Sequence, residues 1–404
     1  MSTTKNNILE FENKGLQSVV RVLAVLAILF FFLVSLNMMG GIFKTIGKDT
    51  SRAILTLTSN PFVGLFMGLL ATAIIQSSST TTSLIVTVVA SGIVPVEAAV
   101  PMIMGANIGT SVTSTIVSLG HVANKNEFRN AIAGATVHDI FNILVTLIIL
   151  PLELAFGFLS GIARAIVNID GVAGEATIEK SKGFMDYTVK AVAKYFNSLL
   201  AEPWIIILIS FVILFFSLRY LTVILKSLLI GKSEENMQKA IFGSPLKAVL
   251  WGTGLTAAVQ SSSVTTSMTV PLVATGKLSL KRAFPFLLGA NIGTTVTALL
   301  ASIGTQHLGV TIALCHFLFN TFGVLLFMLL PFIRTIPVKI AEYIGSLTLK
   351  NRIYGFGYIL IVFFVIPAIM IFFSGIDWKD VESTREQIRL EEKMKKEKEL
   401  QQQP

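Results

Sequence analysis

The sequence has few charged side chains and almost no cysteine. Only 14% of its 404 residues are Asp, Glu, Lys or Arg, while 53% are hydrophobic, and soluble domains carry about 25% charged residues. This composition excludes an ordinary soluble enzyme and predicts a protein that lies in a lipid bilayer. The single cysteine, Cys315, lies within an apolar run, which excludes an intramolecular disulfide and a metal cluster held by thiolates.

Motifs for nucleotide or hydrolytic chemistry are also missing. The sequence contains no phosphate-binding loop, nucleophile elbow or zinc motif, so an ATPase or a hydrolase would lack its reacting groups. We therefore expect neither an enzyme nor a cofactor. The net charge of +9 does not indicate a nucleic-acid partner, because the basic residues lie between apolar runs, where membrane orientation explains them.

Seven apolar runs are long enough to cross a hydrocarbon core of about 30 Å. They are residues 16–39, 99–119, 131–162, 203–225, 283–303, 311–331 and 353–374. Two further apolar stretches, 61–92 and 245–276, are each interrupted by a block of Ser, Thr and Gln. Such side chains compete with the helical backbone for hydrogen bonds, so we predict a broken helix in each stretch.

The chain also contains an internal repeat. Residues 60–120 align without a gap on residues 244–304, and 27 of the 61 aligned positions are identical. The identities gather in a Gln-Ser-Ser-Ser block, which starts at Gln76 and at Gln260, and in Gly-Ala-Asn-Ile-Gly-Thr blocks at 105–110 and 289–294. A weaker match follows the aligned region, where His138 and Asn142 correspond to His316 and Asn320.

The distribution of Lys and Arg indicates how the two halves are oriented. With a cytoplasmic N-terminus and both broken stretches re-entrant, the inner segments hold 17 basic residues and the outer loops hold 8, as the positive-inside rule requires. The tail then lies outside the cytoplasm. The predicted fold class is an all-α polytopic membrane protein with two inverted-topology repeats, each with a broken re-entrant helical hairpin that carries Gln-Ser-Ser-Ser.

This topology divides the chain into six segments. They are an N-terminal segment with the first transmembrane helix and a connector (1–59), transport repeat 1 (60–162), a connector with a transmembrane helix and a loop (163–243), transport repeat 2 (244–334), an amphipathic linker with the last transmembrane helix (335–376), and a charged tail (377–404).

The two polar blocks supply neutral oxygen ligands and hydroxyl donors at membrane depth. A helix that breaks there offers its freed carbonyl groups to a cation such as sodium and its new N-terminus to an anion. The alternative is that the Ser and Thr side chains only hold helices together. The Gly-x-Asn-x-Gly-Thr blocks add an amide beside glycines that allow close backbone approach, and their alternative role is helix packing.

Asp139 is the one carboxylate well inside a predicted crossing. A charge there costs about 2.5 to 3.5 kcal/mol, which makes Asp139 a functional candidate, although a structural hydrogen bond with Asn142 or His138 would also explain it. Glu153 lies near the end of a crossing, where we expect a structural role. For His138 and His316 we expect packing or hydrogen bonding.

Three blocks occur in order: the paired Gln-Ser-Ser-Ser motifs, the paired Gly-Ala-Asn-Ile-Gly-Thr motifs, and Ala133-Gly-Ala-Thr-Val-His138-Asp139-x-Phe141-Asn142. Together they resemble the type II sodium-coupled phosphate cotransporters. The resemblance implies that inorganic phosphate and sodium ions are the transported partners. It also implies electrogenic transport, because Asp139 falls where electrogenic members of the family carry an aspartate.

By motif position, the resemblance assigns a substrate and sodium site to both halves. The candidate residues are Gln76, Ser77, Ser78, Ser79, Asn107, Thr110, Thr113, Asp139, Asn142, Gln260, Ser261, Ser262, Ser263, Asn291, Thr294 and Thr297. Among them, the sodium candidates are Gln76, Asp139, Asn142, Gln260 and Thr294. Ala290, His121 and Asn124 depart from the animal members of the family.

Animal members of the family have a large disulfide-bonded extracellular loop at the place of the connector, whereas the connector here is short and has no cysteines. The resemblance therefore favours a bacterial inner membrane over an animal membrane. We therefore expect a sodium-coupled symporter that imports phosphate by alternating access. Two alternatives stay open at the level of the sequence. One is a carrier of another oxyanion, such as sulfate or arsenate, and the other is a membrane sensor that binds phosphate without transporting it. The oligomeric state does not follow from the sequence.

Overall fold

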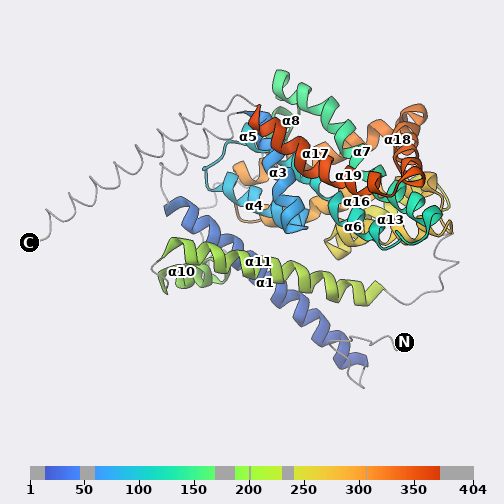
Figure 1. Cartoon of the computed structure of the whole chain (residues 1–404). Coiled ribbons are helices and arrows are strands. Elements are labelled where there is room, and N and C mark those ends of the chain that lie inside the picture. The colour runs from blue at the N-terminus through green and yellow to red at the C-terminus, as the bar shows by residue number, and fades with distance from the viewer. Residues whose placement is uncertain are drawn as a thin grey trace, which may run out of the picture.

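The computed structural model describes residues 14–45, 60–168, 187–199, 202–229, 241–305 and 307–373. All regular structure within these ranges is helical (Figure 1). The helices are α1 (Lys14–Thr45), α3 (Pro61–Ile75), α4 (Ser78–Ala90), α5 (Val96–Gly109), α6 (Ser111–Leu119), α7 (Lys125–Phe156), α8 (Phe158–Val167), α10 (Val189–Leu199), α11 (Pro203–Leu229), α13 (Pro245–Val259), α14 (Ser262–Ser267), α15 (Thr269–Ala274), α16 (Leu280–Ser302), α17 (His307–Leu329), α18 (Pro331–Lys350), α19 (Ile353–Leu360), the π-helical turn η1 (Ile361–Val365) and α20 (Ile366–Phe372). The predicted all-α class is confirmed.

Six segments of the described chain are long and apolar enough to cross a membrane. They are Val22–Ile42, Val96–Leu119, Lys125–Phe156, Leu280–Ser302, His307–Leu329 and Ile353–Phe372. Each matches a crossing that the sequence predicts, so a multi-pass membrane protein is confirmed. The remaining predicted crossing, 203–225, lies in the 27-residue helix α11. Its segment Pro203–Ser217 is apolar but shorter than the six spanning segments.

The prediction of one continuous crossing over 131–162 is wrong at its C-terminal end. Helix α7 stops at Phe156 because Gly157 takes a left-handed conformation with φ 59°, and the chain continues as the separate helix α8. Glycine adopts this conformation without the steric cost that a Cβ imposes. The buried Glu153 carboxylate accepts hydrogen bonds from the backbone N–H groups of Leu159 and Ser160, so Glu153 fixes the start of α8 and has the structural role that we expected.

Both polar blocks interrupt their helices as predicted. Helix α3 ends at Gln76 and α13 ends at Gln260, and these are the only described non-glycine residues with positive φ, at 54° and 53°. The next helix then starts with a serine cap, because Ser77 accepts a hydrogen bond from Thr80 N–H and Ser261 accepts one from Val264 N–H.

Helices α3 and α4 form hairpin 1, and α13, α14 and α15 form hairpin 2. Each hairpin packs closely on the helix that follows it. Helix α3 lies along α5, and α13 lies along α16. A Cβ on Gly105 would overlap the Leu65 carbonyl oxygen, and a Cβ on Gly289 would overlap the Val249 carbonyl oxygen. The glycines of the Gly-Ala-Asn-Ile-Gly-Thr blocks therefore permit the close helix contact, as small residues do between membrane helices.

Helices α1, α10 and α11 form a unit beside the repeats (Figure 1). Their shared core contains Val34, Met38, Val189, Ala193 and Ile206, and it is separate from the large core that the two halves build together. The predicted tail at 377–404, the start of the chain, and most of the two polar connectors lie outside the described residues.

Candidate functional site

The two helix breaks meet in the interior of the protein. The Oγ atoms of Ser78 and Ser262 lie 3.4 Å apart, and the Ser79 hydroxyl donates to the Gln260 carbonyl oxygen at 2.9 Å. Ser78 and Ser262 are buried, at 5% and 1% exposure. The structure therefore brings together the two motifs, which are 184 residues apart in the sequence.

The local structure of each break explains what it can bind. The first backbone N–H groups of a helix lack partners within the helix, and the helix dipole adds a partial positive charge at that end. Helix α4 begins at Ser78, directly at the meeting point, with Ser77 as its cap. Hydroxyl and amide donors at this end suit an oxyanion, and the freed carbonyl oxygens of the preceding helix suit a cation.

The two glutamines differ in their surroundings. Gln76 is exposed, whereas Gln260 is buried and its side-chain Oε1 has no hydrogen-bond partner among the described residues. A buried amide oxygen without a donor is costly in free energy. Gln260 Oε1 can therefore act as a ligand for a small cation that enters the site.

A chain of hydrogen bonds connects the two halves beside the breaks. The His138 Nε2 atom lies 2.5 Å from Asn291 Oδ1, and Asn291 Nδ2 donates to Asn142 Oδ1 at 2.7 Å. Asn142 Nδ2 in turn donates to the Asn107 carbonyl oxygen at 2.9 Å. With Asn291 Oδ1 as acceptor, His138 carries its proton on Nε2, and its Nδ1 atom accepts from the Ser111 hydroxyl at 3.3 Å.

The threonines of the Gly-Ala-Asn-Ile-Gly-Thr blocks are arranged differently. The hydroxyl groups of Thr110 and Thr294 donate to carbonyl oxygens one turn earlier in their own helices, at 3.0 and 2.9 Å, which leaves their oxygen lone pairs available. Three residues beyond the blocks, Thr297 Oγ1 is buried without a partner in the described part of the chain, and Thr113 is half-buried.

Asp139 follows His138 in α7, but its carboxylate makes no hydrogen bond to this network within the described part of the chain. Its Oδ2 atom accepts a hydrogen bond from the Tyr358 hydroxyl of α19 at 2.5 Å, while its Oδ1 atom is buried without a partner among the described residues. The hypothesis of a hydrogen bond with Asn142 or His138 is therefore corrected: His138 and Asn142 take part in the network with Asn291, and the partner of Asp139 is Tyr358.

Sequence reasoning missed three participants. Ser111 contacts His138, the Ser114 hydroxyl lies 3.0 Å from Thr266 Oγ1 in the other half, and Tyr358 contacts Asp139. No motif marks Ser114 or Tyr358. The recurrence of a His-x-x-x-Asn pair after each repeat was the available signal for the histidine network, and the hydrogen-bonding role that we expected for His138 is confirmed.

The fold and the site define a helical, multi-pass membrane protein with a buried polar site between two broken helices. A family model described as Na+/Pi-cotransporter matches residues 29–159 and 213–336. The chain therefore belongs to the Na+/Pi-cotransporter family.

Curated relatives cover most of the chain. The human sodium-dependent phosphate transport protein 2B is 33% identical over 472 aligned residues, covering 93% of this chain and 68% of the relative. The rat and mouse sodium-dependent phosphate transport proteins 2A are 34% and 35% identical, and each alignment covers 88% of this chain and 68% of the relative. No solved structure matches the chain significantly.

Proposed function

We propose that this protein imports inorganic phosphate by symport with sodium. The observation that carries the proposal is the meeting of Ser78 and Ser262 at two helix breaks, within a chain that belongs to the Na+/Pi-cotransporter family. The relatives named above are sodium-dependent phosphate transport proteins, which does not favour a sulfate carrier or a sensor that binds without transporting.

We assign separate roles to the polar groups of the site. The hydroxyl groups of Ser78 and Ser262, with the N-terminus of α4, donate to the phosphate oxygens. The unpartnered Gln260 Oε1 and the oxygen of Thr294 serve sodium, a hard cation that prefers oxygen ligands. Asn291 and Asn142 hold the two halves in register beside the ions rather than binding them.

We propose that repeats 60–162 and 244–334 have inverted topology. Two contacts of the long helix α7 support this. Near its start, Asn130 Nδ2 donates to the carbonyl oxygen of Ala274, at the open end of hairpin 2. Beyond its other end, Arg164 of α8 pairs with Glu97, close to the open end of hairpin 1. The two hairpins thus open toward opposite ends of α7 and meet at their tips.

An orientation follows from the same arrangement and from the distribution of basic residues. Hairpin 1 opens to the outside and hairpin 2 to the cytoplasm of a bacterial cell, and α7 runs outward. Pro95 and Lys277 are exposed residues at the two hairpin openings. Pro95→Cys is expected to react with an impermeant thiol reagent in intact cells, and Lys277→Cys only after lysis. The parent is the control because Cys315 is buried. If Lys277→Cys reacts in intact cells and Pro95→Cys only after lysis, the orientation is wrong. If both variants react in intact cells, the hairpins open to the same side and the inverted topology is wrong.

We further propose that transport is electrogenic and that Asp139 carries the extra charge. A buried carboxylate near a divalent anion needs a cation during the cycle, and sodium is available. Its Oδ1 atom has no partner in the described structure, and Tyr358 holds the other oxygen. The Oδ1 atom thus offers an oxygen lone pair to a sodium ion.

Uptake into proteoliposomes tests the proposed function directly. With an inward sodium gradient, radioactive phosphate is expected to accumulate, and replacing sodium by choline is expected to abolish the accumulation. Sulfate in excess should not compete. Binding of phosphate without sodium-dependent accumulation would contradict the symport mechanism, and complete inhibition by sulfate would contradict the assignment of phosphate as substrate.

A further inference from the structure

Helix α18 is a long helix that is not one of the six candidate crossings. It has 20 residues and carries four charged side chains, Arg334, Lys339, Glu342 and Lys350. Charged side chains are costly in the hydrocarbon core of a bilayer. A role other than crossing the membrane therefore has to explain this helix.

The contacts of α18 place its C-terminal end beside the start of α7. Gly345 lies against the carbonyl oxygen of Arg129, in the second turn of α7. Directly after α18, Arg352 Nη2 donates to the Ala123 carbonyl oxygen at 3.0 Å, shortly before α7 begins. Figure 1 shows α18 at the same end of the molecule as α13. In the orientation proposed above, α7 starts on the cytoplasmic side, so α18 lies near the cytoplasmic surface of the membrane.

The surface of α18 is divided into three faces. The first face is buried in the protein and consists of Pro337, Val338, Ala341, Gly345 and Thr348. The second is an exposed apolar stripe at helical spacing, formed by Phe332, Ile336, Ile340 and Tyr343. The third is polar and consists of Thr335, Lys339, Glu342 and Ser346. At about 100° per residue, the three sets occupy separate sectors around the helix axis.

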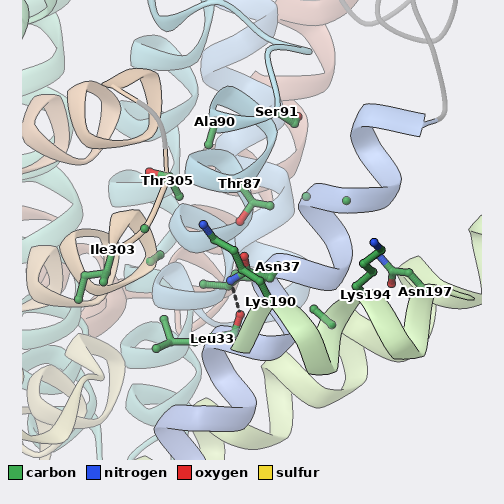
Figure 2. A pocket seen from close by; sticks show the side chains of 16 residues that line it. Leu33, Asn37, Thr87, Ala90, Ser91, Lys190, Lys194, Asn197, Ile303 and Thr305 are labelled. Atoms are coloured by element: carbon green, nitrogen blue, oxygen red, sulfur yellow. Dashed lines mark hydrogen bonds between the residues drawn. The ribbon is translucent and has the colours of Figure 1, made fainter. Parts of the chain in front are cut away.

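Helix α10 provides a contrast. It is also amphipathic, but Lys190, Lys194 and Asn197 line a cavity of about 470 Å³ between α1, α4 and α10 (Figure 2). Part of the polar side of α10 is thus turned toward the interior of the protein. The outward faces of α18 have no such cover in the described part of the chain, because Phe332 and Tyr343 are exposed by 68% and 65%.

A helix with a protein face, an apolar face and a polar face fits the boundary between lipid and water. There, the apolar face enters the region where headgroups meet acyl chains, and the polar face stays hydrated. The stripe includes Tyr343, and tyrosine is enriched at membrane interfaces. Beyond α18, the exposed Ile353 and Tyr354 begin the last spanning segment. The apolar stripe therefore continues into the exposed apolar surface of a membrane-crossing helix.

We propose that α18 is an interfacial helix that seats its apolar stripe in the cytoplasmic leaflet and places Lys339 and Lys350 at the phosphate groups of anionic lipids. Both lysines are exposed, and they lie three turns apart on the same side of the helix, next to the stripe. Lysine side chains reach headgroups while their stems stay on apolar surface. The choice of leaflet rests on the proposed orientation, whereas the interfacial position does not.

The test measures the depth of α18 in nanodiscs that contain the full-length chain. A nitrobenzoxadiazole fluorophore is attached at Ile340→Cys in the stripe or at Glu342→Cys on the polar face, and Cys315 stays unlabelled because it is buried. A nitroxide at carbon 5 of the lipid chains is expected to quench the label at position 340 about twofold more strongly than one at carbon 12. Aqueous iodide should quench mainly the label at position 342. The matched control is Ile361→Cys, exposed in the middle of the last spanning segment, where carbon 12 should quench more strongly.

Three results would overturn the interfacial helix. Equal iodide quenching at positions 340 and 342 would show that α18 lies in water. Stronger quenching at position 340 from carbon 12 than from carbon 5 would place α18 in the middle of the bilayer. Quenching at position 340 by neither lipid nor iodide would show that protein, such as a second copy of the chain, covers the stripe.

The same label tests the contact with anionic lipid. Phosphatidylglycerol and phosphatidylcholine, each with a nitroxide at carbon 5, are compared at equal content, and a preference for phosphatidylglycerol of roughly two- to fivefold is expected around position 340. Lys339→Gln/Lys350→Gln should lose this preference, and Lys339→Arg/Lys350→Arg should keep it. No preference in the parent, or an equal preference in the glutamine variant, overturns the lysine contacts. Neither measurement uses sodium or inorganic phosphate, so a failure of the proposed transport function leaves them unaffected.

Discussion

The two halves carry the same His-x-x-x-Asn pair in different surroundings. In the first half, His138 contacts Asn291 and Ser111, and Asn142 contacts residues of both halves. In the second half, both ring nitrogens of His316 are buried without a partner among the described residues, and so is Asn320 Oδ1. The repeated sequence therefore does not produce equal interactions. The pair in the first half makes hydrogen bonds to the second half, which we call a closed network, whereas the pair in the second half has side-chain atoms without partners among the described residues, which we call an open network.

The largest expected effect comes from breaking the closed network at its centre. Asn291→Ala removes the partner of both His138 Nε2 and Asn142 Oδ1, and each buried polar group left unpaired costs about 1 to 3 kcal/mol. We expect a loss of about 2 to 6 kcal/mol in the free energy of unfolding and loss of uptake, measured by denaturation and in proteoliposomes.

Asn107→Ala is the matched control in the other half. Among the described residues, the Asn107 side chain donates only to the carbonyl oxygen of Ile103 in its own helix, at 2.8 Å. Its backbone carbonyl, which Asn142 contacts, is retained in the variant. We expect a cost of about 1 kcal/mol. Equal losses for the two variants would contradict the difference between the halves.

The second prediction concerns the position where the halves are alike. Ser78→Ala and Ser262→Ala each remove one hydrogen bond to a charged ligand, worth about 1.5 to 3 kcal/mol. The apparent phosphate affinity is therefore expected to fall roughly tenfold to a hundredfold in both variants. Initial uptake rates at increasing phosphate concentration measure this effect. Unchanged affinity in both variants would mean that the serines only hold helices together.

The third prediction uses a position where the halves differ in charge. Asp139 precedes Phe141-Asn142, and the position after His316 is Phe317. Moving one charge through 100 mV is worth about 2.3 kcal/mol. Uptake should therefore accelerate under an inside-negative potassium diffusion potential set with valinomycin. Asp139→Gly should keep some sodium-dependent uptake and lose this acceleration.

Tyr358→Phe is the control for that experiment. It removes the hydrogen bond to Asp139 and keeps the carboxylate and the aromatic packing. Voltage dependence should survive in this variant with a changed sodium dependence. Full voltage dependence in Asp139→Gly would show that Asp139 is only a structural partner of Tyr358 and that another group carries the charge.

The sequence predicts the features that depend on local chemistry. The helix breaks at Gln76 and Gln260 follow from dense Ser, Thr and Gln in an apolar run, and the structure has them where we expected. The end of α7 at Gly157 was missed because a single glycine in an apolar run does not distinguish a helix end from packing. The contacts of Asp139 with Tyr358 and of His138 with Asn291 join residues 219 and 153 positions apart, so only the tertiary fold brings them together.

The smallest expected effect on stability comes from replacing His316, whose ring nitrogens have no partner among the described residues. His138→Met leaves Asn291 Oδ1 unpaired and should cost about 1 to 3 kcal/mol. His316→Met replaces an unpartnered imidazole with an apolar side chain of similar size, and replacement of this kind is nearly neutral or stabilising. We expect a change of less than about 1 kcal/mol in the free energy of unfolding.

Uptake should nevertheless fall in His316→Met. With the inverted topology proposed above, alternating access is expected to exchange the conformations of the two halves, so His316 and Asn320 would close their network in the state where His138 and Asn142 open theirs. A variant that is stable in the present state and impaired in the other should bind phosphate normally and transport it slowly. Binding to detergent-purified protein and uptake into proteoliposomes separate the two properties. If His316→Met transports like the parent, the asymmetry between the halves is a fixed property of the fold and does not reverse during transport.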